Sequence, residues 1–212
     1  GSQGLVTYIR TDSTRIADEA VDAVRDLILD AYGRDYLPEK PNVYKTRKSA
    51  QDAHEAIRPT VVQRRPESIK ASLSRDQYRL YKLIYDRFVS SQMTTAIYDT
   101  LAVDIDADTG ARFHFNGQKL RFPGFTVVYV ESVDDPQEEA ENNSLPDLSE
   151  GMAAKQGEMN AEQHFTQPPP RYTEASLVRT LEELGIGRPS TYSPTISTIT
   201  GRRGYIAKEN KR

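Results

Sequence analysis

The sequence predicts an α+β, multi-domain chain in three parts: a mainly helical part (residues 1–93), an antiparallel β part (94–167) and a final helical part (168–212). Two observations predict this order. Apolar residues recur at intervals of three and four through the first part, and the interval changes to two from residue 94. Three successive prolines then interrupt regular structure and form a stiff, extended connector to the last part.

Charge is segregated along the chain. The 212 residues carry a net charge of −3, but residues 1–93 hold 16 Lys and Arg against 13 Asp and Glu, and residues 171–212 hold 8 against 4. Residues 94–170 hold only 4 against 14. Two basic ends beside an acidic middle are expected where only the ends contact a polyanion such as a nucleic acid.

Composition excludes several classes of protein. The chain has no cysteine and therefore neither disulfides nor thiolate metal sites. No apolar run approaches the roughly 20 residues that span a bilayer, and the N-terminus lacks the pattern of a signal peptide. We therefore expect a soluble, cytoplasmic protein with no membrane partner.

Two long amphipathic helices are predicted in the first part. Residues 18–31 begin with acidic side chains and end just before Gly33, and their apolar face holds Val21, Val24, Leu27 and Ile28. Residues 76–93 carry a wide aromatic and aliphatic stripe, which predicts a core helix. Residues 34–50 are expected to form a surface loop with a basic cluster, Lys45, Arg47 and Lys48.

A shorter helix is expected in residues 50–60, AQDAHEAIRPT, where Pro59 would end it. His54 and Arg58, four residues apart, would share one face of this helix. The run HEAIR is not the zinc motif His-Glu-x-x-His, because Arg58 stands where the second histidine belongs. We therefore expect no metal site here, and a structural histidine is the alternative to a catalytic one.

Residues 95–132 alternate apolar and polar side chains and are expected to form antiparallel strands. Within them Asn116-Gly117 has the composition of a hairpin turn. Residues 134–150 are acidic and almost devoid of apolar side chains, so an exposed loop is expected there. A further strand is expected at residues 153–163.

The last part is expected to hold two helices. Thr173 would cap the first, whose apolar face is Leu177, Val178, Leu181 and Leu184, and Gly185 would close it. Ser190 would cap the second, and a strand would start at Tyr205. This order is winged-helix-like, an arrangement in which the second helix can contact nucleic acid. No returning strand follows, so we expect the polypeptide to be part of a longer one.

A candidate for chemistry lies in residues 4–14, GLVTYIRTDST. If this run is extended, Tyr8 and Arg10 share one face. Tyrosine is a poor nucleophile at neutral pH, and a neighbouring cation favours its phenolate. Because arginine can hold two phosphate oxygens, the pair suits attack on a phosphodiester. On spacing alone, however, a packed aromatic beside a solvated arginine is the favoured interpretation.

Four segments together resemble bacterial DNA topoisomerase I, of the type IA topoisomerase family. They are GLVTYIRTDSTRI, AQDAHEAIRPT, HFTQPPPRYTEASLVRTLEELGIGRPSTY and GRRGYI. They occur in the family's order and cover nearly the whole chain, which makes the resemblance specific. It makes the functional interpretation of Tyr8 the favoured one.

The resemblance implies a mechanism and a set of site residues. Tyr8 would cleave one DNA strand and form a 5′-phosphotyrosine, the other strand would pass through, and the freed 3′-hydroxyl would reverse the reaction without any nucleotide being consumed. Arg10 would stabilise charge on the phosphate, and His54 would form hydrogen bonds near the nucleophile. Arg58, Arg188, Ser190 and Thr191 are expected to contact DNA, the last three along a single-strand path.

The resemblance also implies an architecture and an absence. Residues 1–93 would present the tyrosine, residues 94–167 would belong to a β arch, and residues 168–212 would begin a winged-helix base. The family's Toprim domain, whose acidic residues bind Mg²⁺, has no match here, and the acidic run 134–150 lacks its strand-embedded spacing. We therefore expect this fragment to bind no metal and to have little or no relaxation activity alone.

Three alternatives remain open. Relaxases and rolling-circle initiators also use a tyrosine on DNA, but they need a histidine-rich metal site, and His54, His114 and His164 are far apart in sequence. A non-catalytic single-stranded DNA-binding module and a purely structural fragment are the other two. The expected partner is the single-stranded segment of negatively supercoiled DNA, and the protein is expected to be monomeric.

Overall fold

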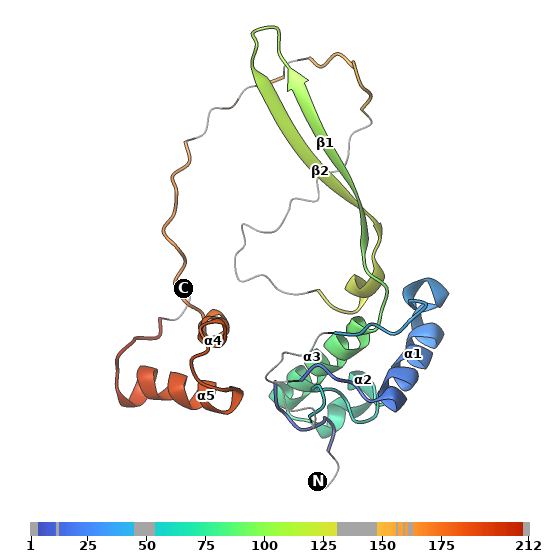
Figure 1. The fold of residues 1–212 in the computed structure, drawn as a ribbon, viewed down its shortest axis with the longest axis vertical. Coiled ribbons are helices and arrows are strands. Elements are labelled where there is room, and N and C mark those ends of the chain that lie inside the picture. Colours follow the sequence, from blue (N-terminus) through green and yellow to red (C-terminus); the bar gives the residue numbers. More distant parts are fainter. Residues whose placement is uncertain are drawn as a thin grey trace.

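The computed structural model describes residues 4–11, 13–44, 54–130, 148–155, 157–158, 160 and 163–209. Within these residues the chain forms a helical unit, a long hairpin that projects from it, and a further pair of helices (Figure 1). The α+β class is confirmed. No helix in the described part is both long and apolar enough to cross a membrane.

The helical unit is built from three helices. They are α1 (Asp18–Tyr32), the short α2 (Pro66–Ile69) and α3 (Arg75–Ser91), with 3-10 turns η1 (Arg34–Tyr36) and η2 (Lys70–Ser72) between them. Both long helices predicted from the sequence are confirmed to within two residues at each end. Ser74 starts α3 with a reciprocal capping box, in which its hydroxyl accepts from Gln77 N at 3.3 Å and its own N–H donates to Gln77 Oε1 at 3.0 Å.

One apolar core holds α1 against α3. Val24 and Ile28 of α1 are fully buried, and α3 contributes Tyr81, Tyr85, Phe88 and Val89. Burial raises the pKa of Tyr85 to about 12, so this phenol stays neutral and acts as a packing residue. The apolar stripe predicted for α3 therefore faces the core, except for Leu83, which lies on the exposed side of the helix.

A buried amide fixes the loop after η1 to the end of α3. Gln92 is completely buried, and its side chain accepts from Asn42 N at 3.2 Å and donates to Asn42 O at 3.0 Å. The Asn42 amide in turn donates to Ser91 O and Met93 O, both at 3.0 Å. The basic cluster Lys45, Arg47 and Lys48 predicted for this loop lies outside the described residues.

The helix predicted for residues 50–60 is wrong for the part that is described, residues 54–60. This stretch is irregular, with an isolated antiparallel bridge between Pro59 and Val6. The reason is competition for backbone donors, because Ala56 N and Thr60 N donate to carbonyls of the first segment of the chain instead of to carbonyls four residues earlier. Residues 50–53 lie outside the described part.

The hairpin consists of β1 (Ile97–Asp106) and β2 (Arg112–Phe122), paired antiparallel. The turn predicted at Asn116-Gly117 is wrong, because these residues lie inside β2 opposite Ala102 and Leu101. The chain turns at residues 107–111 instead, where Gly110 has a φ of +83° and donates its N–H to Ala107 O at 2.9 Å. Gly110 can adopt this left-handed conformation without steric cost, so it supplies the turn that Asn116-Gly117 had suggested.

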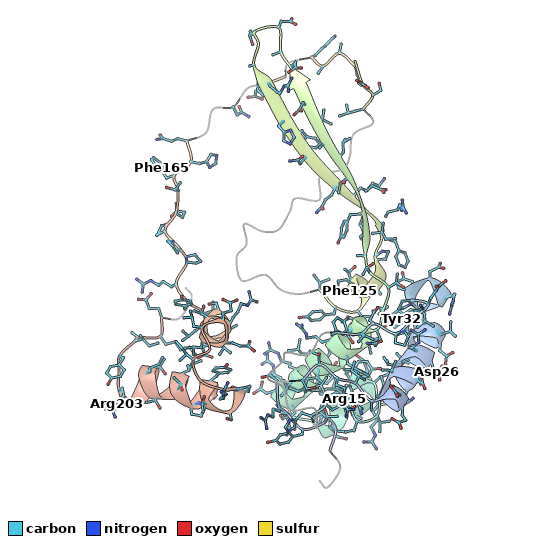
Figure 2. The ribbon with its side chains drawn as sticks, in the orientation of Figure 1. Arg15, Asp26, Tyr32, Phe125, Phe165 and Arg203 are labelled. Atoms are coloured by element: carbon cyan, nitrogen blue, oxygen red, sulfur yellow. The ribbon has the colours of Figure 1, made fainter. Side chains whose placement is uncertain are left out.

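The strands predicted for residues 123–132 are also wrong in the described part, residues 123–130; residues 131–132 lie outside it. Residues Gly124–Val127 form a 3-10 turn, η3, that returns to the helical unit, and Figure 2 shows Phe125 where the hairpin meets that unit. Gly124 has a φ of +49°, and a Cβ there would lie 2.5 Å from Thr94 O. Phe125 and Val128 pack on the core at a spacing of three, so the alternating pattern is overridden by tertiary packing.

The C-terminal unit contains α4 (Glu174–Glu183), α5 (Pro189–Ser197) and the single π-turn η5 (Thr198–Arg202). Thr173 caps α4 as predicted, accepting from Ser176 N at 3.0 Å. Gly185, with a φ of +69°, ends the helix, and Ile186 N donates to Leu181 O at 2.8 Å in a Schellman motif.

Three predictions for the rest of the chain are not met in the described residues. Ser190 is not the cap of α5, because Arg188 occupies the N-cap position. No strand begins at Tyr205 in the described residues up to 209, and none forms in the described part of residues 153–163. Most of the acidic run, residues 134–147, lies outside the described part.

Candidate active site

The described residues 8–11 and 13–14 belong to a loop whose two ends are fixed to the same stretch of chain, residues 55–60. Thr7 and Leu5 hold one end and the residues that lead into α1 hold the other. The hydrogen bonds run from Thr60 N to Leu5 O (3.0 Å), Thr7 N to Arg58 O (2.9 Å), Ala56 N to Arg15 O (2.7 Å) and Ala17 N to Glu55 Oε1 (2.6 Å). Distant parts of the sequence therefore set the shape of the loop that carries Tyr8 and Arg10.

Tyr8, Arg10 and His54 form one cluster. Arg10 Nη1 lies 3.4 Å from His54 Nε2, and the rings of Tyr8 and His54 are stacked with centroids 6.4 Å apart and an interplanar angle of 28°. An arginine can only donate, so Nε2 is the acceptor in this contact. The structure thus brings together the three residues that the sequence marked as catalytic.

A turn, and not a strand, produces this arrangement. Arg10 N donates to Tyr8 O at 3.0 Å, so the chain turns at Ile9, and bridge pairing in this segment occurs only at Val6. The extended conformation expected for residues 4–14 is therefore wrong beyond Thr7. Tyr8 and Arg10 nevertheless meet the same imidazole ring.

The phenol of Tyr8 is accessible, with 75% of the residue exposed. Exposure alone does not single it out, because Tyr172 and Tyr205 are 65% and 71% exposed. The core tyrosine Tyr81 differs in accessibility: it is buried, and its hydroxyl donates to Arg64 O at 2.7 Å. Tyr8 combines a free approach for a large substrate with an adjacent guanidinium and imidazole.

Arg58 does not have the surroundings of a DNA-binding residue. Its guanidinium donates to both oxygens of Glu55 at 3.0 Å and to Pro59 O at 3.0 Å, and its side chain is only 12% exposed. It also does not share a face with His54, because the expected helix is not formed. The edge of the guanidinium formed by Nε and Nη2 is occupied by Glu55, so a phosphate could bind that edge only by replacing a charge-assisted bidentate pair.

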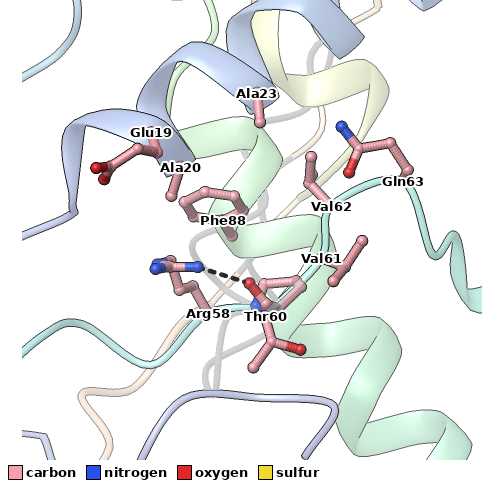
Figure 3. Close-up of a pocket in the computed structure, with 10 residues that line it drawn as sticks. Glu19, Ala20, Ala23, Arg58, Thr60, Val61, Val62, Gln63 and Phe88 are labelled. Atoms are coloured by element: carbon pink, nitrogen blue, oxygen red, sulfur yellow. Dashed lines mark hydrogen bonds between the residues drawn. The ribbon is translucent and has the colours of Figure 1, made fainter.

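A small pocket lies on the other side of Arg58, between α1 and residues 59–63 (Figure 3). Its volume is about 220 Å³, and its walls include Ala20, Ala23 and Phe88. Ligand pockets usually begin at about 300 Å³. The pocket is therefore better explained as a packing gap beside the Arg58 contacts than as a substrate site.

The Tyr8 cluster does not fit the magnesium ion that the resemblance implies. Mg²⁺ prefers oxygen ligands, whereas the described side chains that cluster with Tyr8 are a guanidinium and an imidazole. The nearby carboxylate, Glu55, already accepts from Ala17 N and Arg58. Within the described part of the chain, no group of three or more acidic or histidine side chains is arranged to hold a metal ion.

The other predicted DNA contacts lie at the start of α5, in the C-terminal unit. Arg188, Ser190 and Thr191 are all exposed. The Thr191 hydroxyl accepts from Arg188 N at 2.8 Å and donates to Arg188 O at 3.0 Å, which stabilises the first turn. Exposed amides at a helix N-terminus, a guanidinium and a hydroxyl can bind phosphate oxygens, but Figure 1 shows α5 apart from the segment that carries Tyr8.

Comparison with known proteins agrees with this arrangement. The family model for DNA topoisomerase matches residues 2–212, and the chain belongs to the DNA topoisomerase family. Among solved structures, it is similar to full-length topoisomerase I from Thermotoga maritima, with 35% sequence identity and a TM-score of 0.71. That match covers 97% of this chain and 32% of the other, so the chain spans about a third of the length of that relative.

Two residues around the site were not predicted from the sequence. Thr7 lies beside the nucleophile candidate, and its hydroxyl donates to Ala56 O at 2.8 Å and accepts from Arg58 N at 3.0 Å. Glu55, the residue after His54, accepts a hydrogen bond from Ala17 N at the start of α1. Both act across more than 35 positions in sequence, so no local pattern could have indicated them.

Proposed function

We propose that this chain carries the nucleophile of a type IA DNA topoisomerase and that Tyr8 forms a transient covalent bond with DNA. The observation that carries the proposal is the cluster itself: an exposed phenol stacked on His54, with Arg10 on the same imidazole. Membership of the DNA topoisomerase family supports it. The family relationship also makes DNA the expected partner.

The proposed reaction is a reversible transesterification. Tyr8 Oη attacks a phosphodiester phosphorus, a bond forms from that oxygen to phosphorus, and the bond from phosphorus to the 3′-oxygen breaks. The phenolic proton is transferred to the departing 3′-oxygen, and the phosphate stays on the 5′ side of the break as a phosphotyrosine. The freed 3′-hydroxyl later attacks the same phosphorus and restores both groups, so no nucleotide is needed.

Arg10 and His54 have separate roles in this proposal. The Arg10 guanidinium neutralises charge that accumulates on the non-bridging oxygens during attack. His54 accepts from Arg10 and stacks on Tyr8, so it orients both groups toward one phosphate. Positioning of this kind favours the attack because the reacting groups need not be ordered at each turnover.

Strand passage is proposed to need more than this chain supplies. The chain spans about a third of its full-length relative. Among the described residues, the side chains around Tyr8 do not fit Mg²⁺, so we propose that metal-binding carboxylates lie on other residues of the whole protein. Relaxation of negatively supercoiled DNA is then a property of the whole protein, and this chain alone is expected to relax supercoiled DNA little or not at all.

End-labelled single-stranded DNA tests the proposal in the full-length protein that carries this segment. A 5′-phosphotyrosine retains the DNA downstream of the break, so 3′-labelled DNA should become protein-linked after denaturation and 5′-labelled DNA should not. The Tyr8→Phe variant should lose the adduct, and Tyr205→Phe, which alters an equally exposed tyrosine, should keep it. An adduct that survives Tyr8→Phe, or that retains the 5′ label, would overturn the mechanism.

A second candidate function is single-stranded DNA binding without chemistry. The exposed Arg188, Ser190 and Thr191 at the start of α5 favour it, as does the excess of basic residues in 171–212. Such a module should bind single-stranded DNA with an affinity that falls steeply with salt. Equal binding by wild type and Tyr8→Phe, with no adduct from either, would support this alternative over the first.

A further inference from the structure

Glu55 is a partly buried carboxylate that holds two parts of the chain together beside the Tyr8 cluster. Its Oε1 accepts from Ala17 N at 2.6 Å, and both of its oxygens accept from Arg58 Nη2 at 3.0 Å. Arg58 Nε adds a contact of 3.2 Å to Oε1. The two side chains are only 12% and 23% exposed, so these charge-assisted hydrogen bonds are weakly screened by solvent.

The contact with Ala17 connects the site to α1. Ala17 is the N-cap residue of α1 and has no side-chain cap of its own. In a capping box the third helical residue accepts the N-cap N–H, but that position in α1 is Ala20, which cannot accept. Glu55 takes over this function from a distant part of the sequence, and so fixes the end of loop 8–14 to the residue that follows His54.

Arg58 acts on the other side of the same carboxylate. Its Nη1 donates to Pro59 O at 3.0 Å, and its backbone N–H and C=O contact Thr7. The guanidinium therefore holds the Glu55 carboxylate in one orientation, while its backbone holds the near end of the loop. Glu55 and Arg58 together fix both ends of the loop relative to His54.

We propose that Glu55 is a positioning residue for the Tyr8–Arg10–His54 cluster and that Arg58 acts through it, not through DNA. This inference rests on the proposed function. The carboxylate keeps the end of loop 8–14 against the stretch that carries His54, so Arg10 reaches the imidazole and Tyr8 stacks on it. Neither Glu55 nor Arg58 needs to touch the substrate.

The variant Glu55→Gln tests this with almost no change in shape. The amide oxygen of the glutamine can still accept from Ala17 N. Its NH₂ group, however, can only donate, as can the Arg58 guanidinium, so the bidentate pair is broken. Arg58→Lys keeps the charge but cannot grip both oxygens, so it should act in the same direction. Glu174→Gln is the matched control, because it removes the carboxylate of an exposed ion pair with Lys208 in the C-terminal unit.

The first measurement is NMR of the imidazole signals of the 212-residue chain, which has only three histidines. Wild type should show an NOE between the rings of Tyr8 and His54. Glu55→Gln should shift the His54 signals and weaken that NOE, while the signals of His114 and His164 stay in place. Glu174→Gln should change none of the His54 signals. Should Glu55→Gln fail to fold, Arg58→Lys gives the same comparison.

The second measurement is the rate of adduct formation by the full-length protein with single-stranded DNA. Glu55→Gln should slow adduct formation by about 10- to 100-fold, the usual effect of displacing a catalytic group. The dissociation constant for DNA should change little, because neither residue contacts phosphate. A purely structural role would lower thermal stability without this separation of rate from binding.

Three results overturn the inference: an unchanged His54 signal and NOE, an unchanged adduct rate, or a loss of DNA affinity that accounts for the whole loss of rate. The last result would support the prediction from the sequence that Arg58 contacts DNA. Failure of wild type to form any adduct would refute the proposed function instead. The NMR comparison would still decide whether Glu55 positions His54.

Discussion

The Thr7 hydroxyl offers a quantitative test of how the loop is held. It donates to Ala56 O at 2.8 Å and accepts from Arg58 N at 3.0 Å in a partly buried position. The variant Thr7→Val keeps the shape of the side chain but leaves a carbonyl and an amide without this partner. At about 0.5–1.5 kcal/mol for each hydrogen bond, the loss of two should cost about 1–3 kcal/mol of unfolding free energy.

Urea unfolding followed by circular dichroism at 222 nm measures this loss, because α1 and α3 provide much of the helical signal. Thr7→Ser is the matched control: it retains the hydroxyl and should remain close to wild type. A Thr7→Val variant within about 0.5 kcal/mol of wild type would behave like an ordinary surface substitution and would refute the reasoning. A Thr7→Ser variant as unstable as Thr7→Val would do the same, since the hydroxyl would not be the cause.

Three other predictions follow from the fold. The hydrogen bond that the His114 imidazole donates to Asp104 raises the pKa of His114, so the pairing stabilises the hairpin fully below about pH 6.5 and is lost as pH rises through the higher folded pKa. Amide exchange in β1 and β2, corrected for its intrinsic rate, should show this loss in wild type and not in His114→Gln. Gly110→Ala should destabilise the hairpin by about 1 kcal/mol, because φ is +83° there, whereas Gly117→Ala should carry no such penalty; amide exchange checks both. Ile28→Ala should cost about 2–5 kcal/mol in urea unfolding, because Ile28 is fully buried in the core.

Local sequence patterns were sufficient to predict a helix wherever the helix buries one face or is capped by residues next to it in sequence. The spacing of Val24 and Ile28 predicted α1 and its buried face, and Thr173 and Gly185 predicted both ends of α4. In α4, the hydrogen bonds that start and stop the helix lie within a few residues of one another, whereas α1 was predicted from its buried face alone and its N-cap N–H donates to the distant Glu55. For α4, a short stretch of sequence therefore contains the donors and acceptors that decide where the helix begins and ends.

Patterns failed where a distant segment supplies the partner. Residues 54–60 have helical spacing, but Ala56 and Thr60 donate to the first segment of the chain. Asn116-Gly117 has the composition of a turn, but Gly110 allows the chain to turn earlier and fixes the register that places Asn116 in β2. In both cases the local conformational preference contributes little free energy, and pairing with a distant segment of the chain outweighs it.

The candidate active site also combines residues that the sequence predicted with residues whose contacts depend on distant segments. Spacing made Tyr8 and Arg10 candidates only; the resemblance favoured their functional interpretation and added His54, 44 positions from Arg10, and the structure brings all three together. Arg58, predicted to contact DNA, is largely buried and paired with Glu55, and the rate and affinity measurements on the Glu55 and Arg58 variants test that prediction. Thr7 and Glu55 could not be predicted, because their contacts depend on how two loops meet.

Mass spectrometry of the covalent complex is the most direct test of the central claim that Tyr8 is the nucleophile. The full-length protein would be trapped on single-stranded DNA, treated with nuclease and digested with trypsin. Cleavage after Arg10 separates Tyr8 from every later tyrosine of this chain, and fragmentation of the peptide that ends at Arg10 locates the added mass. We predict a nucleotide joined through its 5′-phosphate to Tyr8 in that peptide. The same mass addition on a peptide that contains any other tyrosine, with this one unmodified, would contradict the account.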